Sequence, residues 1–273
     1  MKTIIISGAN SGIGKEAALQ LAQAGHQIIM LSRDSEKSRT ARQEIVSATG
    51  NQNVVLIPVD LAEANSIRQA VAVIQEKYPK IDVLVNNAGL YKVKRAENAT
   101  GIEMSFAVNY LAIFMLSQLL IENLAASGNG RIINVVSELY KSGKINFDDL
   151  MLEKNYKVGD AYANAKYASV LFSAELAQKV KEKGVTVNTL HPGVLATEVF
   201  RDYPKLLAKF MNLFLEKPEK GGERIAYLAV DDAVANTTGK YFYKLDEREI
   251  EISSEEKETT ERLWKLSEEM IAA

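Results

Sequence analysis

The chain has 273 residues, of which 47% are apolar, enough to bury a large hydrophobic core. Its 33 basic and 35 acidic residues give a net charge of −2, and no basic cluster stands out, so we expect no nucleic-acid partner. The absence of cysteine excludes disulfides, thiolate nucleophiles and cysteine-ligated metals. These properties favour a cytoplasmic protein.

The chain enters a short apolar run, residues 3–7, directly after its first two residues. This run is too short for the core of a signal peptide or for a membrane span, so we expect no transmembrane segment. Internal repeats, low-complexity tracts and linkers rich in proline or glycine are absent from the sequence. We therefore expect a single domain over residues 1–273.

Short apolar runs rich in β-branched residues predict seven strands, and longer segments with helical periodicity separate many of them. The predicted strands are 4–7, 27–31, 54–59, 81–86, 132–137, 185–191 and 241–243. The predicted helices are 12–24, 35–49, 63–78, 102–126 and 162–183. Alternation of this kind predicts an α/β fold, a doubly wound domain whose mostly parallel, seven-stranded sheet carries helices on both faces.

Two segments interrupt the alternation. Residues 138–160 carry little periodicity and predict a long surface loop, and residues 195–220 form the second interruption. Within the latter, the stretch 203–216 has an apolar stripe, which fits core or lid packing, a subunit contact or shallow membrane association. We expect both segments to build a substrate pocket.

A glycine-rich turn follows the first strand and precedes a helix. Glycines at this place let the backbone bend sharply and approach a pyrophosphate, while free N–H groups attract the anion. The strand before and the helix after it favour this reading over an ordinary tight turn. The residues that we expect to bind the cofactor here are Gly8, Asn10, Ser11, Gly12, Ile13 and Gly14.

The end of the second strand reads Ser32-Arg33-Asp34. An acid at this position binds the ribose 2′-hydroxyl of NAD, whereas an arginine suits the 2′-phosphate of NADP. Arg33 therefore favours NADP. NAD stays possible, because Asp34 could reach a ribose or simply pair with Arg33 at the surface.

Seven motifs in chain order resemble those of the short-chain dehydrogenase/reductase family over essentially the whole chain. They are the turn Gly8 to Gly14, Asp60-Leu61, Asn86-Asn87-Ala88-Gly89, Asn109, Ser137, Tyr162-x3-Lys166 and Pro192-Gly193. The segments GKINFDDL, VLFSAELA, HPGVLATEV and ERLW are most similar to the retinol dehydrogenase branch. The resemblance implies a Rossmann-fold oxidoreductase with a nicotinamide cofactor.

The resemblance also implies cofactor contacts after several strands. Asp60, followed by Leu61, is implied to bind the adenine, and Asn86, Ala88 and Gly89 to border the adenosine ribose. The backbone of Pro192, Gly193 and Val194 is implied to hold the nicotinamide carboxamide, with Thr197 near the phosphates. Each motif has an ordinary alternative, since an aspartate can cap a helix and the other two segments can be plain turns.

Reduction of a carbonyl by hydride transfer needs a proton donor and a hydrogen bond to the developing oxyanion. Tyr162 and Lys166 share a helix face, so the lysine is expected to lower the phenol pKa from about 10. Ser137 is expected to hold the substrate oxygen. Asn109 is either a satisfied core asparagine or, as the resemblance implies, half of a water-mediated proton path with Lys166. Both tyrosine and lysine are also expected to touch the cofactor.

Tyr167 points about 100° away from this face, so we expect it to pack rather than react. We also expect structural roles for His26 and His191 and no metal site.

There are three departures from the family pattern. Ser7 replaces a threonine but keeps a hydroxyl, Ala112 and Ile113 stand where the retinol branch often has Gly-His, and Glu138 stands where a second serine is common. A carboxylate beside the reactive oxygen suits an apolar substrate badly unless Glu138 turns to solvent.

We therefore expect an NADP-dependent enzyme that interconverts an alcohol and an aldehyde or ketone of small to medium, largely apolar structure. One alternative is a redox sensor or scaffold that binds NADP(H) without turnover. A second is a 3-oxoacyl thioester reductase, against which the C-terminal segment GKYFYKLDEREIE argues. The predicted helices 102–126 and 162–183 could pair between subunits, so a homo-oligomer is possible.

Overall fold

A computed structural model describes residues 1–194 and 216–272. In this part of the chain one sheet of eight strands has the order β3-β2-β1-β4-β5-β6-β7-β8. The strands are β1 (Thr3–Ser7), β2 (Gln27–Ser32), β3 (Val54–Pro58), β4 (Val83–Asn86), β5 (Arg131–Val135), β6 (Thr186–His191), β7 (Lys240–Tyr243) and β8 (Asp246–Glu249).

Strands β1 to β7 are mutually parallel, which confirms the predicted doubly wound α/β sheet, and β8 adds an antiparallel edge to β7. The chain runs from β1 outward to β3 and then returns to place β4 on the other side of β1. This reversal marks the switch point of the sheet between β1 and β4. In open α/β sheets ligands bind in a crevice at the carboxyl ends of the strands beside such a switch point.

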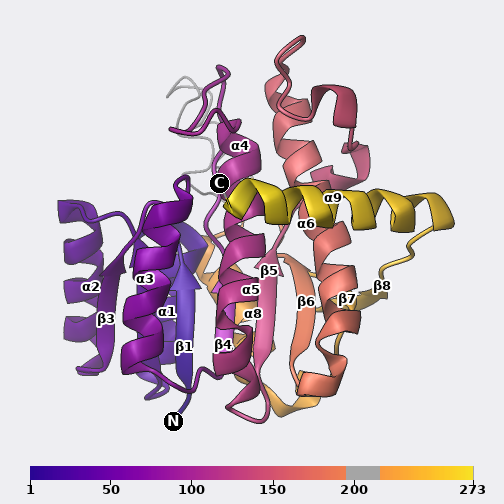
Figure 1. Cartoon of the computed structure of the whole chain (residues 1–273). Coiled ribbons are helices and arrows are strands. Elements are labelled where there is room, and N and C mark those ends of the chain that lie inside the picture. Colours follow the sequence, from indigo (N-terminus) through magenta and orange to yellow (C-terminus); the bar gives the residue numbers. More distant parts are fainter. Residues whose placement is uncertain (195–215, 273) are drawn as a thin grey trace.

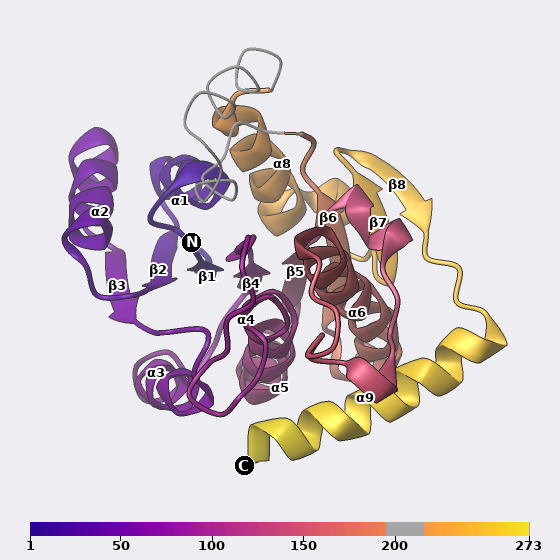
Figure 2. The same ribbon diagram turned by 90° about the horizontal axis from the view of Figure 1, so that it is seen from above.

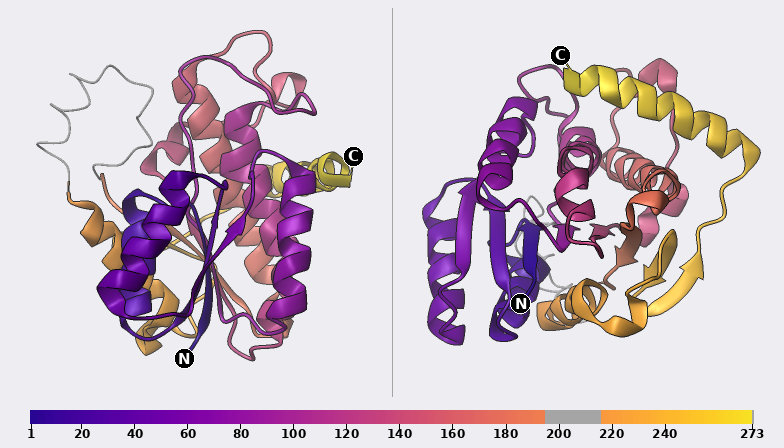
Figure 3. Two further views of the ribbon diagram at one scale, coloured as in Figure 1. Left: turned by 90° about the vertical axis from the view of Figure 1, so that its left-hand side faces the viewer. Right: turned by 60° about the horizontal axis from the view of Figure 1, so that its bottom comes forward.

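Helices cover both faces of the sheet (Figures 1 and 2). They are α1 (Gly12–Gln23), α2 (Glu36–Thr49), α3 (Ala64–Lys77), α4 (Met104–Phe106), α5 (Ala112–Ala125), α6 (Val158–Lys179), α8 (Pro218–Val230) and α9 (Ser254–Ala272). Figure 2 shows α1, α2 and α8 on one face and α3, α5 and α6 on the other. The left view of Figure 3 shows the twisted sheet between these two layers, and α9 runs outside α5 and α6.

Successive side chains of β1 pack into the helix layers on opposite faces of the sheet. Ile5 belongs to the core cluster shared with α5 and α6, whereas Ile4 and Ile6 belong to the cluster shared with α1 and α8. All three are fully buried. Because successive strand residues point to opposite faces, a strand covered on both sides needs the continuous apolar run that this sequence has.

The predicted helix 102–126 is one continuous apolar helical segment, in which a π-helical turn, Ala107–Leu111, joins α4 to α5. Among the described residues, Met104–Ala125 alone has the length and composition of a membrane span, with a mean hydropathy of 1.8. Since 78% of that window is buried inside the protein, its apolar character is explained by its place in the core.

Several boundaries differ from the prediction. The sequence did not indicate β8, α8 or α9, and β5 ends at Val135, two residues before Ser137. The expected loop 138–160 contains two 3₁₀ turns, Glu138–Ser142 and Phe147–Asp149, and α6 already begins at Val158. Thr197 and most of the apolar stripe at 203–216 lie outside the described residues.

Candidate active site

The glycine-rich turn after β1 is closely packed against the loop after β4. A Cβ on Gly14 would lie 2.5 Å from the carbonyl oxygen of Gly8 and 2.3 Å from Nδ2 of Asn87, so only glycine fits there. Gly8 and Gly12 adopt left-handed φ values of 68° and 54°. Ser11, the N-cap of α1, makes no capping bond with its side chain. The N-terminal N–H groups of α1 are thereby suited to an anion such as a diphosphate.

Ser7 joins the two loops that flank the crevice. Its hydroxyl accepts hydrogen bonds from the backbone N–H groups of Asn87 at 2.9 Å and Ala88 at 3.0 Å. Asn87 Nδ2 donates in return to the Ser7 carbonyl oxygen at 2.9 Å. Ser7 therefore supplies the hydroxyl that links these two loops, although it lacks the methyl group of the threonine that is usual at this position.

Arg33 lies directly after β2, and its side chain is exposed. Asp34 is paired with Arg39, whose Nε donates to Oδ1 of Asp34 at 2.9 Å. The alternative pairing of Arg33 with Asp34 is therefore not the one adopted. An open pocket of about 540 Å³ between the starts of α1 and α2 is lined by Asn10, Ser11 and Lys37 among other residues.

Ser38 is a buried residue of this region that the sequence did not single out. Its hydroxyl accepts from Nδ2 of Asn10 at 3.0 Å and donates to the Arg33 carbonyl oxygen at 2.8 Å. It therefore ties the glycine-rich turn to the loop that carries Arg33. One feature of the sequence could have indicated a structural role for Ser38. It is the third residue of α2 after the N-cap Ser35, and its backbone N–H donates to the Ser35 hydroxyl.

The side chains of Asp60 and Asn86 form hydrogen bonds within the protein. Oδ1 of Asp60 accepts from the Ala62 N–H at 3.0 Å, as a turn-forming aspartate does. The Asn86 side chain is buried and donates to Asn134 at 2.8 Å and to Ser117 at 3.2 Å. The contact that the resemblance implies between Asn86 and the ribose stays a prediction.

Tyr162 and Ser137 meet at the carboxyl edge of the sheet. Both side chains are partly exposed, and Ser137 is close enough to the phenol to influence its pKa. The Tyr91 ring packs against the Tyr162 ring with centroids 5.2 Å apart. Burial raises the pKa of Tyr162 to about 12, although the nearby Ser137 opposes this shift. The phenol is therefore protonated at neutral pH.

The pKa of Tyr162 is raised overall, against the expectation that Lys166 would lower it. Lys166 does lie one turn after Tyr162 on α6, but its Nζ donates to the Val135 carbonyl oxygen at 2.8 Å and is 5.7 Å from the centre of the tyrosine ring. Burial lowers the pKa of Lys166 to about 8. Desolvation of both groups outweighs their mutual interaction, which the spacing alone did not indicate.

Asn109 lies in the π-helical turn and is fully buried. Its side chain accepts from the Leu90 N–H at 2.8 Å and donates to the Leu90 carbonyl oxygen at 2.9 Å. The position of a Cβ on Gly89 would be 3.2 Å from Oδ1 of Asn109 and 3.7 Å from Nζ of Lys166. The two members of the implied proton path thus flank the same glycine, and the path itself stays a prediction.

Glu138 is bonded to residues other than the reaction groups. Its carboxylate accepts hydrogen bonds from the Tyr241 hydroxyl and, at 2.8 Å, from Lys141 Nζ. Burial by itself raises the pKa of Glu138, but these two hydrogen bonds lower it below its usual value. The carboxylate is bound by β7 and by its own turn, an alternative to solvent exposure that the sequence did not suggest.

The turn Pro192 to Val194 follows β6, which is the neighbour of β5. Gly193 has a left-handed φ of 96°, and Val194 is 59% exposed. His191 precedes this turn, is buried and packs on Tyr243, with ring centroids 5.3 Å apart. Within residues 1–194 and 216–272, His, Asp and Glu form no group of three or more that could hold a metal.

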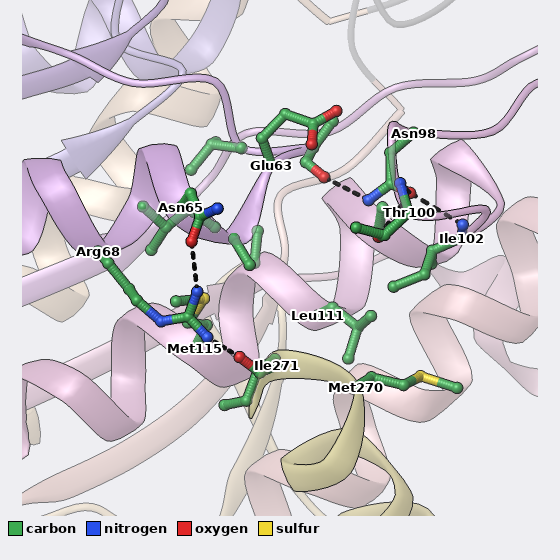
Figure 4. Close-up of a pocket in the computed structure, with 16 residues that line it drawn as sticks. Glu63, Asn65, Arg68, Asn98, Thr100, Ile102, Leu111, Met115, Met270 and Ile271 are labelled. Atoms are coloured by element: carbon green, nitrogen blue, oxygen red, sulfur yellow. Dashed lines mark hydrogen bonds between the residues drawn. The ribbon is translucent and has the colours of Figure 1, made fainter. Parts of the chain in front are cut away.

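A separate cavity of about 60 Å³ lies between α3, α5 and the end of α9 (Figure 4). Leu111, Met115 and Met270 form part of its apolar lining. On its rim, NH1 of Arg68 donates to Asn65 at 2.8 Å. None of the four predicted catalytic residues lines this cavity, so it is distinct from the reaction site.

Comparisons with known proteins agree with this geometry. The family model for short chain dehydrogenases matches residues 2–206. Retinol dehydrogenase 13 of Homo sapiens is 39% identical over 279 residues, covering 99% of this chain and 84% of that protein. Retinol dehydrogenase 14 of Mus musculus is 36% identical over 286 residues, covering 99% of this chain and 86% of that protein.

The fold has a close counterpart in the solved structure of an uncharacterised protein from Mycobacterium paratuberculosis. The TM-score is 0.78 at 27% identity, over 100% of this chain and 94% of that one. The chain therefore belongs to the short-chain dehydrogenase family and is most similar to its retinol dehydrogenase branch. It is an oxidoreductase of this family, and its fold supports a nicotinamide cofactor.

Proposed function

We propose that this protein is an NADP-dependent oxidoreductase that interconverts an apolar alcohol and the corresponding aldehyde or ketone. The observation that carries the proposal is the meeting of Ser137 and Tyr162 at the carboxyl edge of the sheet, where the serine is close enough to influence the pKa of the phenol. Two hydroxyls so placed can bind one substrate oxygen together. The bound nicotinamide would supply or accept the hydride.

The chain's own residues would handle the oxygen and its proton. Tyr162 is protonated at neutral pH, the form that can donate a proton to a carbonyl oxygen as negative charge develops on it. Ser137 would donate a second hydrogen bond to that oxygen. Lys166, held by the Val135 carbonyl, would keep a cation near the ring when protonated and stabilise the phenolate left behind.

Two observations support NADP over NAD. Arg33 directly follows β2 and its side chain is exposed, and an arginine at this place suits a 2′-phosphate. Asp34, the group that would favour NAD, is neutralised by Arg39. The Ser38 bonds hold the Arg33 loop and the glycine-rich turn in one arrangement.

Exposed apolar residues in the loops at the carboxyl edge of the sheet support an apolar substrate. Val93, Leu139 and Val194 are 44%, 47% and 59% exposed, and they lie in the loops that follow β4, β5 and β6. The Tyr91 ring adds an apolar wall beside Tyr162. The partners of Glu138 bind its carboxylate, which satisfies the polar group that would oppose such a substrate.

The test follows NADPH and NADH absorbance with hexanal, decanal and all-trans-retinaldehyde, the last chosen because the relatives are named retinol dehydrogenases. We expect turnover with NADPH, a kcat/KM that rises with the apolar length of the aldehyde, and loss of turnover in Tyr162→Phe. Binding of NADPH without turnover of any carbonyl or alcohol would favour the sensor alternative. A preference for 3-oxoacyl thioesters would favour the second alternative.

We also propose a cytoplasmic location, which the lack of cysteine supports. Fractionation of cells that express the full chain tests it, and recovery in the membrane fraction after a high-salt wash would contradict it.

A further inference from the structure

Glu216 is bound by two cations from separate elements. Its Oε2 lies 2.5 Å from NH2 of Arg224 on α8, and its Oε1 lies 2.6 Å from Nζ of Lys244, in the turn between β7 and β8. The Arg224 side chain is only 12% exposed. The hydrogen bond from Lys244, followed by that from Arg224, lowers the pKa of Glu216, although burial opposes the shift. We call these three residues the Glu216 clasp.

Each member of the Glu216 clasp is also bonded to the backbone at the end of β6. NH1 of Arg224 donates to the Pro192 carbonyl oxygen at 2.5 Å. The Lys244 N–H donates to the His191 carbonyl oxygen at 2.8 Å, and the Glu216 N–H donates to the Val194 carbonyl oxygen at 3.2 Å. Three carbonyl groups of one four-residue turn are therefore fixed from three separate segments.

The guanidinium group lies directly against the turn. A Cβ on Gly193 would be 2.8 Å from NH1 of Arg224, closer than side chains normally approach, and Gly193 has a φ of 96°. Lys244 itself has a left-handed φ of 60°, which is uncommon for a lysine. A glycine is therefore required at this position for Arg224 to approach the turn so closely.

Arginine is specifically suited to this place because its planar fork directs separate nitrogens at two acceptors. NH1 serves the Pro192 carbonyl and NH2 serves Glu216. A lysine has one terminal nitrogen and cannot span both acceptors in this geometry. Loss of the arginine would also leave Glu216 with one cation in place of two.

The turn lies where the reactive end of the cofactor must be. The glycine-rich turn after β1 and Arg33 after β2 lie on one side of the crevice, whereas Ser137 follows β5 on the other side. A dinucleotide whose adenosine end lies near Arg33 must therefore extend toward β5 and β6 to bring its nicotinamide to Ser137 and Tyr162. The turn after β6 borders that position.

We propose that the Glu216 clasp fixes the Pro192 to Val194 turn and thereby sets the position of the nicotinamide end of the cofactor relative to Tyr162. In this role Arg224 is a positioning residue, and the inference rests on the proposed function. One signal for this role is visible in the sequence: a lone arginine beside the buried Ile225, in a helix whose other cation, Lys220, is exposed. An ordinary structural ion pair would affect stability but not the placement of one end of a ligand.

The experiment compares wild type with Arg224→Lys and Glu216→Gln. Lys220→Met is the matched control, because Lys220 lies on the same helix and forms an exposed ion pair with Glu223. The measurements are the Kd of NADPH, the Kd of adenosine 2′,5′-bisphosphate, which contains only the adenosine half, and kcat and KM for decanal. A melting temperature for each variant reports on folding.

For Arg224→Lys and Glu216→Gln we expect kcat to fall about 10- to 100-fold, as displacement of a reacting group by about 1 Å causes. NADPH should bind more weakly, the adenosine bisphosphate as in wild type, and Lys220→Met should match wild type throughout. Unchanged kcat in both variants, or equal weakening of both ligands, would overturn the inference. If wild type bound neither ligand, the proposed function would fail instead, which is a distinguishable result.

Discussion

Lys166 and Tyr162 lie on one face of α6, with Nζ of the lysine 5.7 Å from the centre of the tyrosine ring. Burial disfavours the charged form of each group. It raises the pKa of the Tyr162 phenol to about 12 and lowers the pKa of the Lys166 ammonium to about 8. At neutral pH the phenol is uncharged and its raised pKa costs nothing, so the cost to stability comes from the buried ammonium. Such a cost is typical of groups that serve a reaction.

Tyr162→Phe tests the proton donor. The substitution keeps the ring and its packing on Tyr91 but removes the hydroxyl group. We expect kcat to fall about 10²- to 10⁴-fold, the usual contribution of general acid catalysis. The Kd of NADPH and the melting temperature should stay near those of wild type. Steady-state kinetics with decanal measures the change, and equal turnover by variant and wild type would contradict the mechanism.

Lys166→Met tests the buried ammonium through stability. The folded pKa of about 8 lies below the ordinary lysine value, so between these values the unfolded chain binds more protons and stability rises with pH. The penalty is complete below the folded pKa. Relative to Lys166→Met, wild type should gain about 2 kcal/mol of unfolding free energy from about pH 7 to about pH 10.

Urea unfolding at both pH values measures this difference. The methionine variant should also lose catalytic activity, since it cannot stabilise a phenolate. Parallel pH dependence of the two proteins would show that Lys166 is not desolvated as the geometry indicates.

The elements that the sequence predicted and those that it did not differ in where their apolar groups lie. Strands β1 to β7 are largely buried, so their β-branched runs are visible. Strand β8, Asp246–Glu249, consists of four exposed charged residues and pairs with β7 through its backbone, which leaves no apolar pattern. In α9 a narrow buried stripe, Thr260, Leu263 and Ser267, is set among glutamates and lysines.

The same distinction applies to the site. Ser137, Tyr162 and Lys166 were predictable because each lies at a fixed place relative to a strand end or a helix turn. The direction of Glu138 was not, because its partner Tyr241 is 103 residues away and becomes a neighbour only through the pairing of β6 with β7. Desolvation of Lys166 likewise depends on the whole surrounding fold.

Arg33→Ala tests the choice of cofactor. Removal of the guanidinium takes away a charge-assisted contact worth about 1.5–3 kcal/mol, so NADPH should bind about 10- to 100-fold more weakly. The Kd of NADH, which lacks the 2′-phosphate, should change little. Lys77→Ala, which removes an exposed cation at the end of α3, is the control for net charge. Equal weakening of NADH and NADPH would argue against recognition of the 2′-phosphate by Arg33.

Ser38→Ala tests whether the two loops of the adenosine site act together. The substitution removes the bonds to Asn10 and to the Arg33 carbonyl, so we expect part of the NADPH preference of wild type to be lost. Ser267→Ala is the matched control, because Ser267 is equally buried and bonds Tyr110 far from this site. Both variants should lose stability by about 1 kcal/mol, but only Ser38→Ala should change the ratio of the two Kd values.

The last prediction concerns α9, which lies along the outside of α5 and α6 (Figures 2 and 3). Its Trp264 ring packs 5.1 Å from that of Phe114 on α5 and 5.4 Å from that of Phe172 on α6, with Lys179 Nζ 4.9 Å above it. The face through which α5 and α6 could pair between subunits is therefore covered by the chain itself. We expect a monomer at micromolar concentration.

Trp264→Ala should lower the unfolding free energy by about 2–3 kcal/mol and expose this apolar face, so that the variant self-associates. Lys265→Ala, at the exposed neighbouring position, should remain monomeric and as stable as wild type. Analytical ultracentrifugation and urea unfolding measure the two effects. A wild-type dimer cross-linked through α5 or α6 would contradict the prediction, because α9 and a second subunit cannot occupy the same face.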